Sequence, residues 1–172
     1  MNYFEIFDLP VSLNIDNKYL RKKYIELSRA SHPDYFIRDN EEVKKDTLEF
    51  SAVLNKAYKT LGNRDETIKY LLKEKGIIED DEKYVLSPEF LMEMMELNEE
   101  LAETEFSGDK ESSERVSMML VNIENEIYKP VQFIIENYKE GITSEQELMH
   151  VKDYYFRKKY LQRLRDQLDQ KS

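Results

Sequence analysis

Residues 29–36 read "RASHPDYF" and decide how the first half of the chain folds. Pro33 disfavours helical backbone at the residue before it, so a helix that runs into this stretch must end near Ser31. His32, Pro33 and Asp34 are therefore expected on a loop. Because Pro33 fixes one backbone torsion between two polar side chains, both are offered to a partner with little conformational entropy left to lose.

The segments on either side of this loop carry apolar residues at helical spacing. Upstream, Asp16 is suited to cap a helix that ends near Ser31. The expected buried face of that helix is Tyr19, Leu20, Tyr24 and Leu27. Downstream, a second helix is expected to end at Gly62. Its expected buried face is Leu48, Ala52 or Val53, Leu54, Ala57 and Leu61. The two patterns predict an antiparallel helical hairpin, flanked by short helices over "NYFEIF" and "RDETIKYLLKEKG".

The second half begins with an acidic connector and a strong helix start. Residues 77–86 read "IIEDDEKYVL", and the "SPE" that follows offers Ser87 as a cap and Pro88 at the first helical position. Helical patterns then cover 88–106, 110–139 and 144–170, with glycines between them. We expect an all-α protein with a domain at 1–76, a connector at 77–86 and a three-helix bundle at 87–172.

Composition supports a helical chain and excludes several kinds of site. The 172 residues include only four glycines and four prolines, and 36% are charged. There is no cysteine and there are two histidines, so no metal site, no cofactor and no thiol chemistry is expected. No apolar run approaches the roughly 18 residues of a membrane span, and the start lacks a signal pattern. A cytoplasmic protein without membrane partners is expected.

Charge divides the chain into unequal halves. Residues 1–75 contain 14 Lys and Arg against 13 Asp and Glu, whereas the remainder contains 12 against 23. The acidic half is poorly suited to binding phosphate backbones, so no nucleic-acid partner is expected.

A catalytic role for His32 and Asp34 is disfavoured. Alternation across Pro33 is not expected to aim both side chains at one substrate. Ser31 adjoins His32, but no third group is placed to complete a triad. No catalytic residue is assigned.

The stretch 87–106, "SPEFLMEMMELNEELAETEF", holds more apolar residues than one buried stripe requires. A sufficient core face is formed by Phe90, Met94, Leu97 and Leu101. The apolar residues left over are Leu91, Met92 and Met95, which lie beside Glu93, Glu96 and Glu99. Two interpretations stay open: Leu91 and Met95 widen the core stripe, or the extra residues form a groove for a partner, to which flexible methionines are suited.

The first half resembles the J-domain. The resemblance rests on four features in order: a short aromatic helix, a basic helix, the tripeptide His-Pro-Asp, and a helix reading "LNKAYKTLG". Without that context, the tripeptide would be read as a turn and the basic run as a solvated helix face. The resemblance implies that the chain binds a DnaK-type chaperone and stimulates its ATP hydrolysis. It assigns chaperone binding to Arg21, Lys22, Lys23, Arg29, His32, Pro33 and Asp34.

Over essentially its whole length the chain resembles the HscB family, J-domain co-chaperones of iron-sulfur cluster assembly. The similar stretches are "NYFEIFDLP" at 2–10, "HPD" at 32–34, "YLL" at 70–72 and "FLMEMMELNEELAE" at 90–103. This resemblance implies a scaffold partner, IscU, and a specialised chaperone, HscA. The implied scaffold contacts are Leu91, Met92, Met95, Glu96 and Glu99, joined by Phe156 or its neighbour Tyr155.

Two departures from the family pattern leave the affinity for the chaperone open. Tyr35 follows the tripeptide where a basic residue is frequent, and a small residue precedes it where an aromatic one is common. The four-cysteine zinc segment of some eukaryotic relatives is absent, so a bacterial cytoplasmic form is expected ahead of one in the mitochondrial matrix. The alternative function is a J-protein that recruits its chaperone to a different client.

Overall fold

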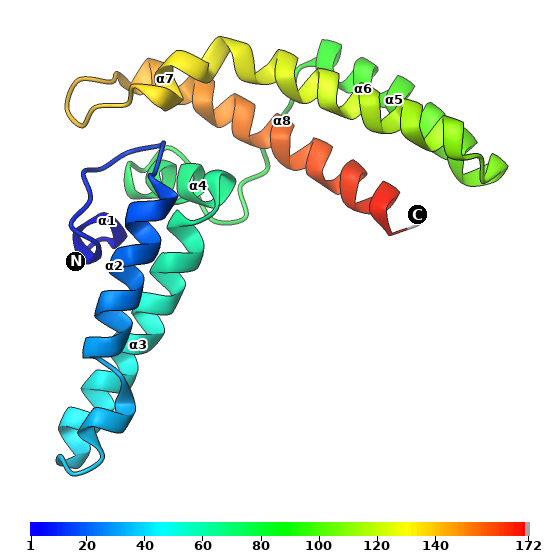
Figure 1. The fold of residues 1–172 in the computed structure, drawn as a ribbon. Coiled ribbons are helices and arrows are strands. Elements are labelled where there is room, and N and C mark those ends of the chain that lie inside the picture. Colours follow the sequence, from blue (N-terminus) through cyan, green and yellow to red (C-terminus); the bar gives the residue numbers. More distant parts are fainter. Residues whose placement is uncertain (171–172) are drawn as a thin grey trace. The chain divides into compact units, whose positions relative to one another are not determined.

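The computed structural model describes residues 1–170, and these contain helices and no strand (Figure 1). The elements are α1 (Tyr3–Ile6), α2 (Asn17–Ala30), η1 (Pro33–Phe36), α3 (Glu41–Leu61), α4 (Arg64–Glu74), α5 (Pro88–Ser107), α6 (Lys110–Tyr128), η2 (Lys129–Val131), α7 (Gln132–Glu136) and α8 (Glu145–Asp169). The predicted all-α class is confirmed. The chain divides into two compact units, one of Met1–Lys75 with Ile135–Thr143, the other of Gly76–Ile134 with the segment that begins at Ser144.

The first unit is built on the hairpin of α2 and α3, which lie side by side (Figure 1). Asp16 caps α2 by accepting hydrogen bonds from the backbone N–H groups of Lys18 and Tyr19 at 2.9 and 3.2 Å. The helix ends at Ala30, as the position of Pro33 predicted. Tyr24 of α2 stacks on Tyr58 of α3 with ring centroids 4.0 Å apart, which holds the two helices in register.

The core of the first unit occupies one end of the hairpin. Its buried residues on α2 and α3 are Leu20, Leu54, Ala57 and Leu61. Leu48 and Val53, which were predicted to be buried, are 63% and 45% exposed, and Ala52 is also exposed. The cause is the spacing within α3, whose buried stripe is Leu54, Ala57 and Leu61. At about 3.6 residues per turn, Leu48 and Ala52 lie on the opposite side of the helix and Val53 lies beside the stripe. Of the predicted face of α2, only Leu20 is fully buried.

The second unit contains a bundle of α5, α6 and α8. Its core consists of Phe90, Met94, Leu97 and Leu101 from α5, Val116, Leu120 and Ile123 from α6, and Leu161, Leu164 and Leu168 from α8. Each of these sets repeats at intervals of three or four residues, so every helix buries one stripe. Ser87 caps α5 by accepting a hydrogen bond from the Phe90 N–H at 3.2 Å, as predicted.

The middle of the second half differs from the prediction of one helix over 110–139. Pro130 lacks a backbone N–H, and the chain there passes from α6 through the short 3₁₀ turn η2 into α7. Residues 135–143 then belong to the first unit, where Tyr138 is buried. The Glu140 carboxylate pairs with Lys75 and accepts a hydrogen bond from the Tyr138 hydroxyl, and both contacts lower the pKa of Glu140. The segment predicted as bundle therefore contributes nine residues to the other unit.

The turn between α5 and α6 requires a left-handed backbone conformation at Gly108. This residue has φ of 64°, and its N–H donates to the Thr104 carbonyl at 3.0 Å. No atom lies within 4 Å of the position that a Cβ would take, so a side chain would cost only backbone strain. We expect Gly108→Ala to lower the free energy of unfolding by about 1–2 kcal/mol. Asn adopts the left-handed region more readily, so Gly108→Asn should cost less. Chemical denaturation followed by circular dichroism compares the two, and an equal loss in both would contradict the prediction.

Candidate functional site

The tripeptide forms a small ordered turn. His32 caps η1, and its Nδ1 accepts a hydrogen bond from the Asp34 N–H at 3.3 Å. The Asp34 carboxylate lies 3.5 Å from the same nitrogen, and both side chains are exposed. The expectation that Pro33 would aim the two side chains apart is wrong, because Pro33 begins a 3₁₀ turn that folds Asp34 back toward His32. The turn therefore presents His32 and Asp34 together, as one polar surface.

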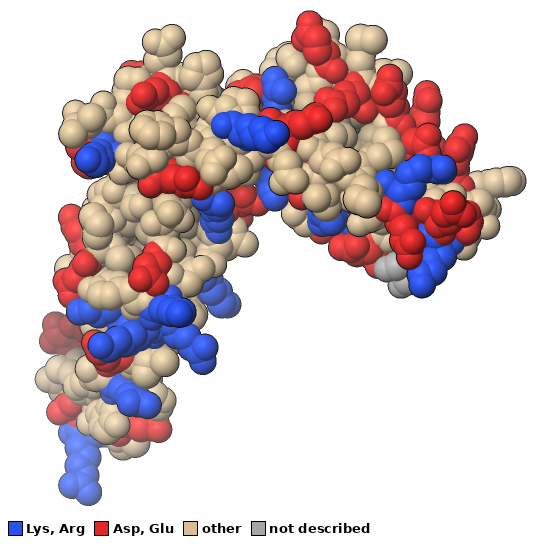
Figure 2. All heavy atoms as spheres, turned by 45° about the horizontal axis from the view of Figure 1, so that its top comes forward, with Lys and Arg blue, Asp and Glu red and all other residues tan. Residues whose placement is uncertain are grey.

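The basic residues of α2 differ in availability. Arg21, Lys22 and Arg29 are exposed, whereas Lys23 is partly covered and donates to the Asp8 carboxylate at 2.9 Å. That hydrogen bond and the charge of Asp8 raise the pKa of Lys23. In Figure 2, Lys and Arg side chains gather on the hairpin of the first unit. Three of the four predicted basic residues are thus open to a partner, and Lys23 is already paired.

Helix α5 separates its apolar residues into two sets. Leu91, Met92 and Met95 are 40%, 67% and 63% exposed, whereas none of the residues predicted for its core face exceeds 2%. Glu96 and Glu99 are exposed on the same helix. We call Leu91, Met92, Met95, Glu96 and Glu99 the α5 patch. The interpretation in which Leu91 and Met95 only widen the core stripe does not hold for Met95, whose side chain is mostly exposed.

The two aromatic candidates on α8 have different surroundings. Tyr155 is only 7% exposed, so of the two alternatives its side chain is the less open to a partner. Phe156 is half-buried and stacks on Tyr84 with ring centroids 4.6 Å apart. The Tyr84 hydroxyl donates to Asp153 at 2.8 Å, and burial together with this bond raises the pKa of Tyr84 to about 12.

The predicted connector is held against α8 by several contacts. Besides Tyr84, the Lys152 ammonium donates to the Ile77 carbonyl at 2.9 Å and to the Glu82 carboxylate at 3.0 Å. Tyr84 was not among the predicted site residues, although it is the single aromatic residue of the 77–86 stretch.

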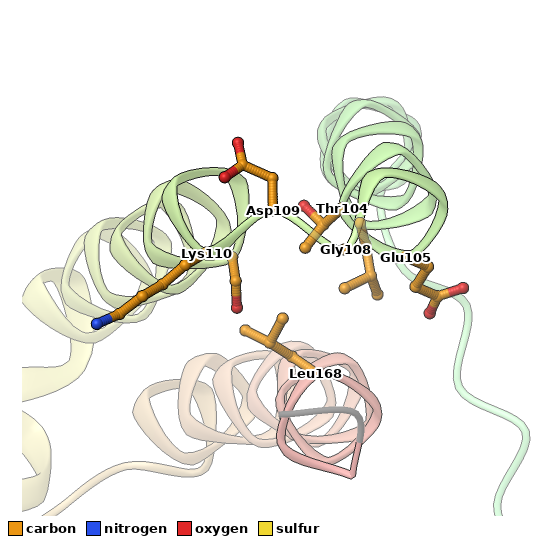
Figure 3. A pocket seen from close by; sticks show the side chains of 8 residues that line it. Thr104, Glu105, Gly108, Asp109, Lys110 and Leu168 are labelled. Carbon is orange, nitrogen blue, oxygen red and sulfur yellow. The ribbon is translucent and has the colours of Figure 1, made fainter.

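A separate hollow lies at the end of the bundle where α5 turns into α6 (Figure 3). Leu168 and Thr104 point into it, while the charged ends of Glu105, Asp109 and Lys110 point away. None of the predicted site residues lines it. A ligand there would meet mainly apolar surface, and we assign it no role.

None of the helices in the described part of the chain combines the length and apolarity needed to cross a membrane. Within the same residues, His, Asp and Glu side chains form no group of three or more that could hold a metal ion.

Known proteins with similar sequences include HscB co-chaperones. The family model for the HSCB C-terminal oligomerisation domain matches residues 86–169. The co-chaperone protein HscB homolog of Shewanella halifaxensis is 32% identical over 171 residues, which cover 98% of this chain and 95% of that protein. The homolog from Vibrio vulnificus strain YJ016 is 36% identical over 137 residues, covering 74% and 80%.

Solved structures agree with these matches. Chaperone HscB from Vibrio cholerae is 26% identical, with a TM-score of 0.79 over 99% of this chain and 96% of that one. Human co-chaperone protein HscB is 27% identical, with a TM-score of 0.85 over 99% and 82%. The fold and the matched sequences are those of an all-helical co-chaperone. The chain belongs to the HscB co-chaperone family.

The division of α5 into a core face and a patch predicts two classes of mutant. Alanine at Phe90, Leu97 or Leu101 removes buried volume and should lower the free energy of unfolding by about 2–5 kcal/mol. Replacing Leu91, Met92 and Met95 together by alanine removes mostly exposed atoms and should leave the melting temperature nearly unchanged. Thermal melts of both sets decide the matter. If the triple mutant melts as early as the core mutants, the patch is part of the core.

Proposed function

We propose that this chain holds an IscU-like scaffold on the α5 patch and delivers it to an HscA-like chaperone of the DnaK type. In this proposal the chain stimulates the ATPase of that chaperone and so assists iron-sulfur cluster transfer in the bacterial cytoplasm. It performs no chemistry of its own. The observation that carries the proposal is the exposure of Leu91, Met92 and Met95 on a helix whose core face is already complete.

The chaperone contact is proposed at the His32-Pro33-Asp34 turn and the basic residues of α2. The turn supports this role because its own hydrogen bond fixes it, so little conformational entropy is lost on docking. Arg21, Lys22 and Arg29 are exposed and supply positive charge beside the turn. Exposed charges of this kind raise the rate of encounter more than the final affinity.

The scaffold contact is proposed at the α5 patch together with Phe156. Apolar anchors surrounded by polar groups are typical of the centre of a binding surface, where a few residues supply most of the free energy. Tyr155 is left out of this surface because it is buried. Lys23 is retained in the chaperone contact, with one of its three N–H donors already given to Asp8.

The turn is tested by removing its two functional groups. His32→Gln and Asp34→Asn should each abolish stimulation of the chaperone ATPase, with scaffold affinity and melting temperature unchanged, because both side chains are exposed. Asp39→Asn, the same change in the same exposed loop, is the matched control and should stimulate normally. The measurement is ATP turnover by the chaperone with this chain, with the scaffold, and with both. Normal stimulation by both mutants would remove the basis of the chaperone assignment.

The basic face is tested by charge reversal. Arg21→Glu and Lys22→Glu should slow association with the chaperone by up to about tenfold at low salt, and added salt should shrink the difference as the charges are screened. Lys56→Glu on α3 is the control for net charge and should have a smaller effect. Stopped-flow association at several salt concentrations measures the rates. Rates independent of salt would show that this face is only solvated.

The scaffold assignment is tested with the same triple alanine mutant of Leu91, Met92 and Met95. Truncation of central apolar anchors can cost about 2 kcal/mol or more each, so scaffold binding should fall at least tenfold while the fold persists. Calorimetric titration of the scaffold into wild type and mutant gives the two affinities. If wild type binds an unrelated client in a pull-down and no scaffold, the alternative J-protein function is correct.

A further inference from the structure

The connector and α8 form a pocket beside Phe156 whose charge is opposite to that of the unit around it. Three aromatic rings line it, those of Tyr84, Phe156 and Tyr160. Three cations join them, namely Lys83, Lys159 and Arg163. Asp and Glu outnumber Lys and Arg by 23 to 12 in residues 76–172, so a cluster of three cations is unusual there.

These three cations do not stabilise the fold through polar contacts within residues 1–170. Each is exposed and makes no hydrogen bond or ion pair there. Other cations of α8 do have one, because Arg157 pairs with Asp153 at 2.7 Å and Arg165 with Glu124 at 3.0 Å. Glu82 also lines the pocket, but its charge is met by Lys152. The pocket therefore carries positive charge that the described fold leaves uncompensated.

The pocket adjoins one edge of the α5 patch. Asn98 of α5 donates to the Tyr160 hydroxyl at 3.3 Å, so the side of α5 that carries Asn98 faces α8. Leu91 and Met95 precede Asn98 by seven and three residues and lie on that same side of the helix. Tyr160 also meets the ring of Phe90 edge-on, with centroids 6.1 Å apart. An extended segment lying on Leu91 and Met95 would therefore reach the pocket.

The opposite edge of the patch is acidic. Glu100 lies 3.5 Å from Arg115 of α6, which shows that this side of α5 faces α6. Glu93 is on the same side, where burial and then the charge of Glu126 raise its pKa. Glu96 follows Glu93 by three residues and shares that side. The apolar residues of the α5 patch, Leu91, Met92 and Met95, thus lie between carboxylates on the α6 side and cations on the α8 side.

We propose that the Lys83, Lys159 and Arg163 pocket binds an acidic side chain of the scaffold segment that docks on the α5 patch. The aromatic rings contact the aliphatic part of that side chain, and the cations donate charge-assisted hydrogen bonds to its carboxylate. The α6 side of the α5 patch carries carboxylates and the α8 side carries cations. A scaffold segment with acidic side chains along one border and basic side chains along the other can therefore pair with both sides in one orientation only. This inference rests on the proposed scaffold function and adds where the acidic and basic side chains of the scaffold segment lie.

The test is charge reversal with a matched control. Lys159→Glu combined with Arg163→Glu should weaken binding of an IscU-like scaffold at least tenfold at low salt and reduce the dependence of affinity on salt. The control pair, Lys110→Glu with Lys129→Glu, makes the same change in net charge on exposed residues of α6 and η2. It should change affinity by no more than about twofold. Calorimetry measures affinity, and circular dichroism checks the fold.

A milder pair of substitutions controls for misfolding of the charge-reversed protein. Lys159→Gln with Arg163→Gln removes attraction without adding repulsion, so it should weaken binding in the same direction by a smaller factor. If wild type binds the scaffold and the charge-reversed pair binds within twofold of it, the inference is overturned while the proposed function stands. An equal loss in the control pair would also overturn it, because the effect would then be that of net charge. Failure of wild type to bind the scaffold would overturn both.

Discussion

A helix in a small bundle can bury only the stripe that faces its neighbours, and the second unit depends on this constraint. α5 contains more apolar residues than its stripe holds, and Phe90, Met94, Leu97 and Leu101 fill the stripe with no more than 2% exposure. The remaining apolar residues must then stay at the surface, where they lose the free energy that burial would give. Within the bundle nothing offsets that loss, and a partner that covers them would recover it.

The predictable parts of the fold were those set by local chemistry. Asp16 and Ser87 cap helices where their side chains were expected to, and Pro33 ends α2. The core face of α5 followed from its spacing alone, because three packed helices demand one stripe from each. Caps, prolines and stripes act within a few residues, so one sequence is enough to read them.

The unpredicted parts depend on which segments meet. Tyr155 and Phe156 are neighbours in sequence, and only the packing of α8 shows that the first is buried. Pro130 is a local signal for the end of α6, because it lacks a backbone N–H. The return of 135–143 to the first unit involves the pair of Lys75 with Glu140, which are 65 residues apart in sequence.

The proposed surfaces of the two units solve different physical problems. The turn at His32 to Asp34 is small, so it needs a fixed shape, and the bond from the Asp34 N–H to His32 provides one. The α5 patch is apolar and rich in methionine, so contact area can supply affinity, but flexible methionines select a partner poorly. Charged borders can supply that selectivity, because a wrongly oriented segment would place like charges together at both edges. Glu96 on one side and Lys159 with Arg163 on the other therefore cost little stability in the free protein, where all three side chains remain solvated. In this proposal their arrangement selects one orientation for a segment bound on the apolar residues of the α5 patch.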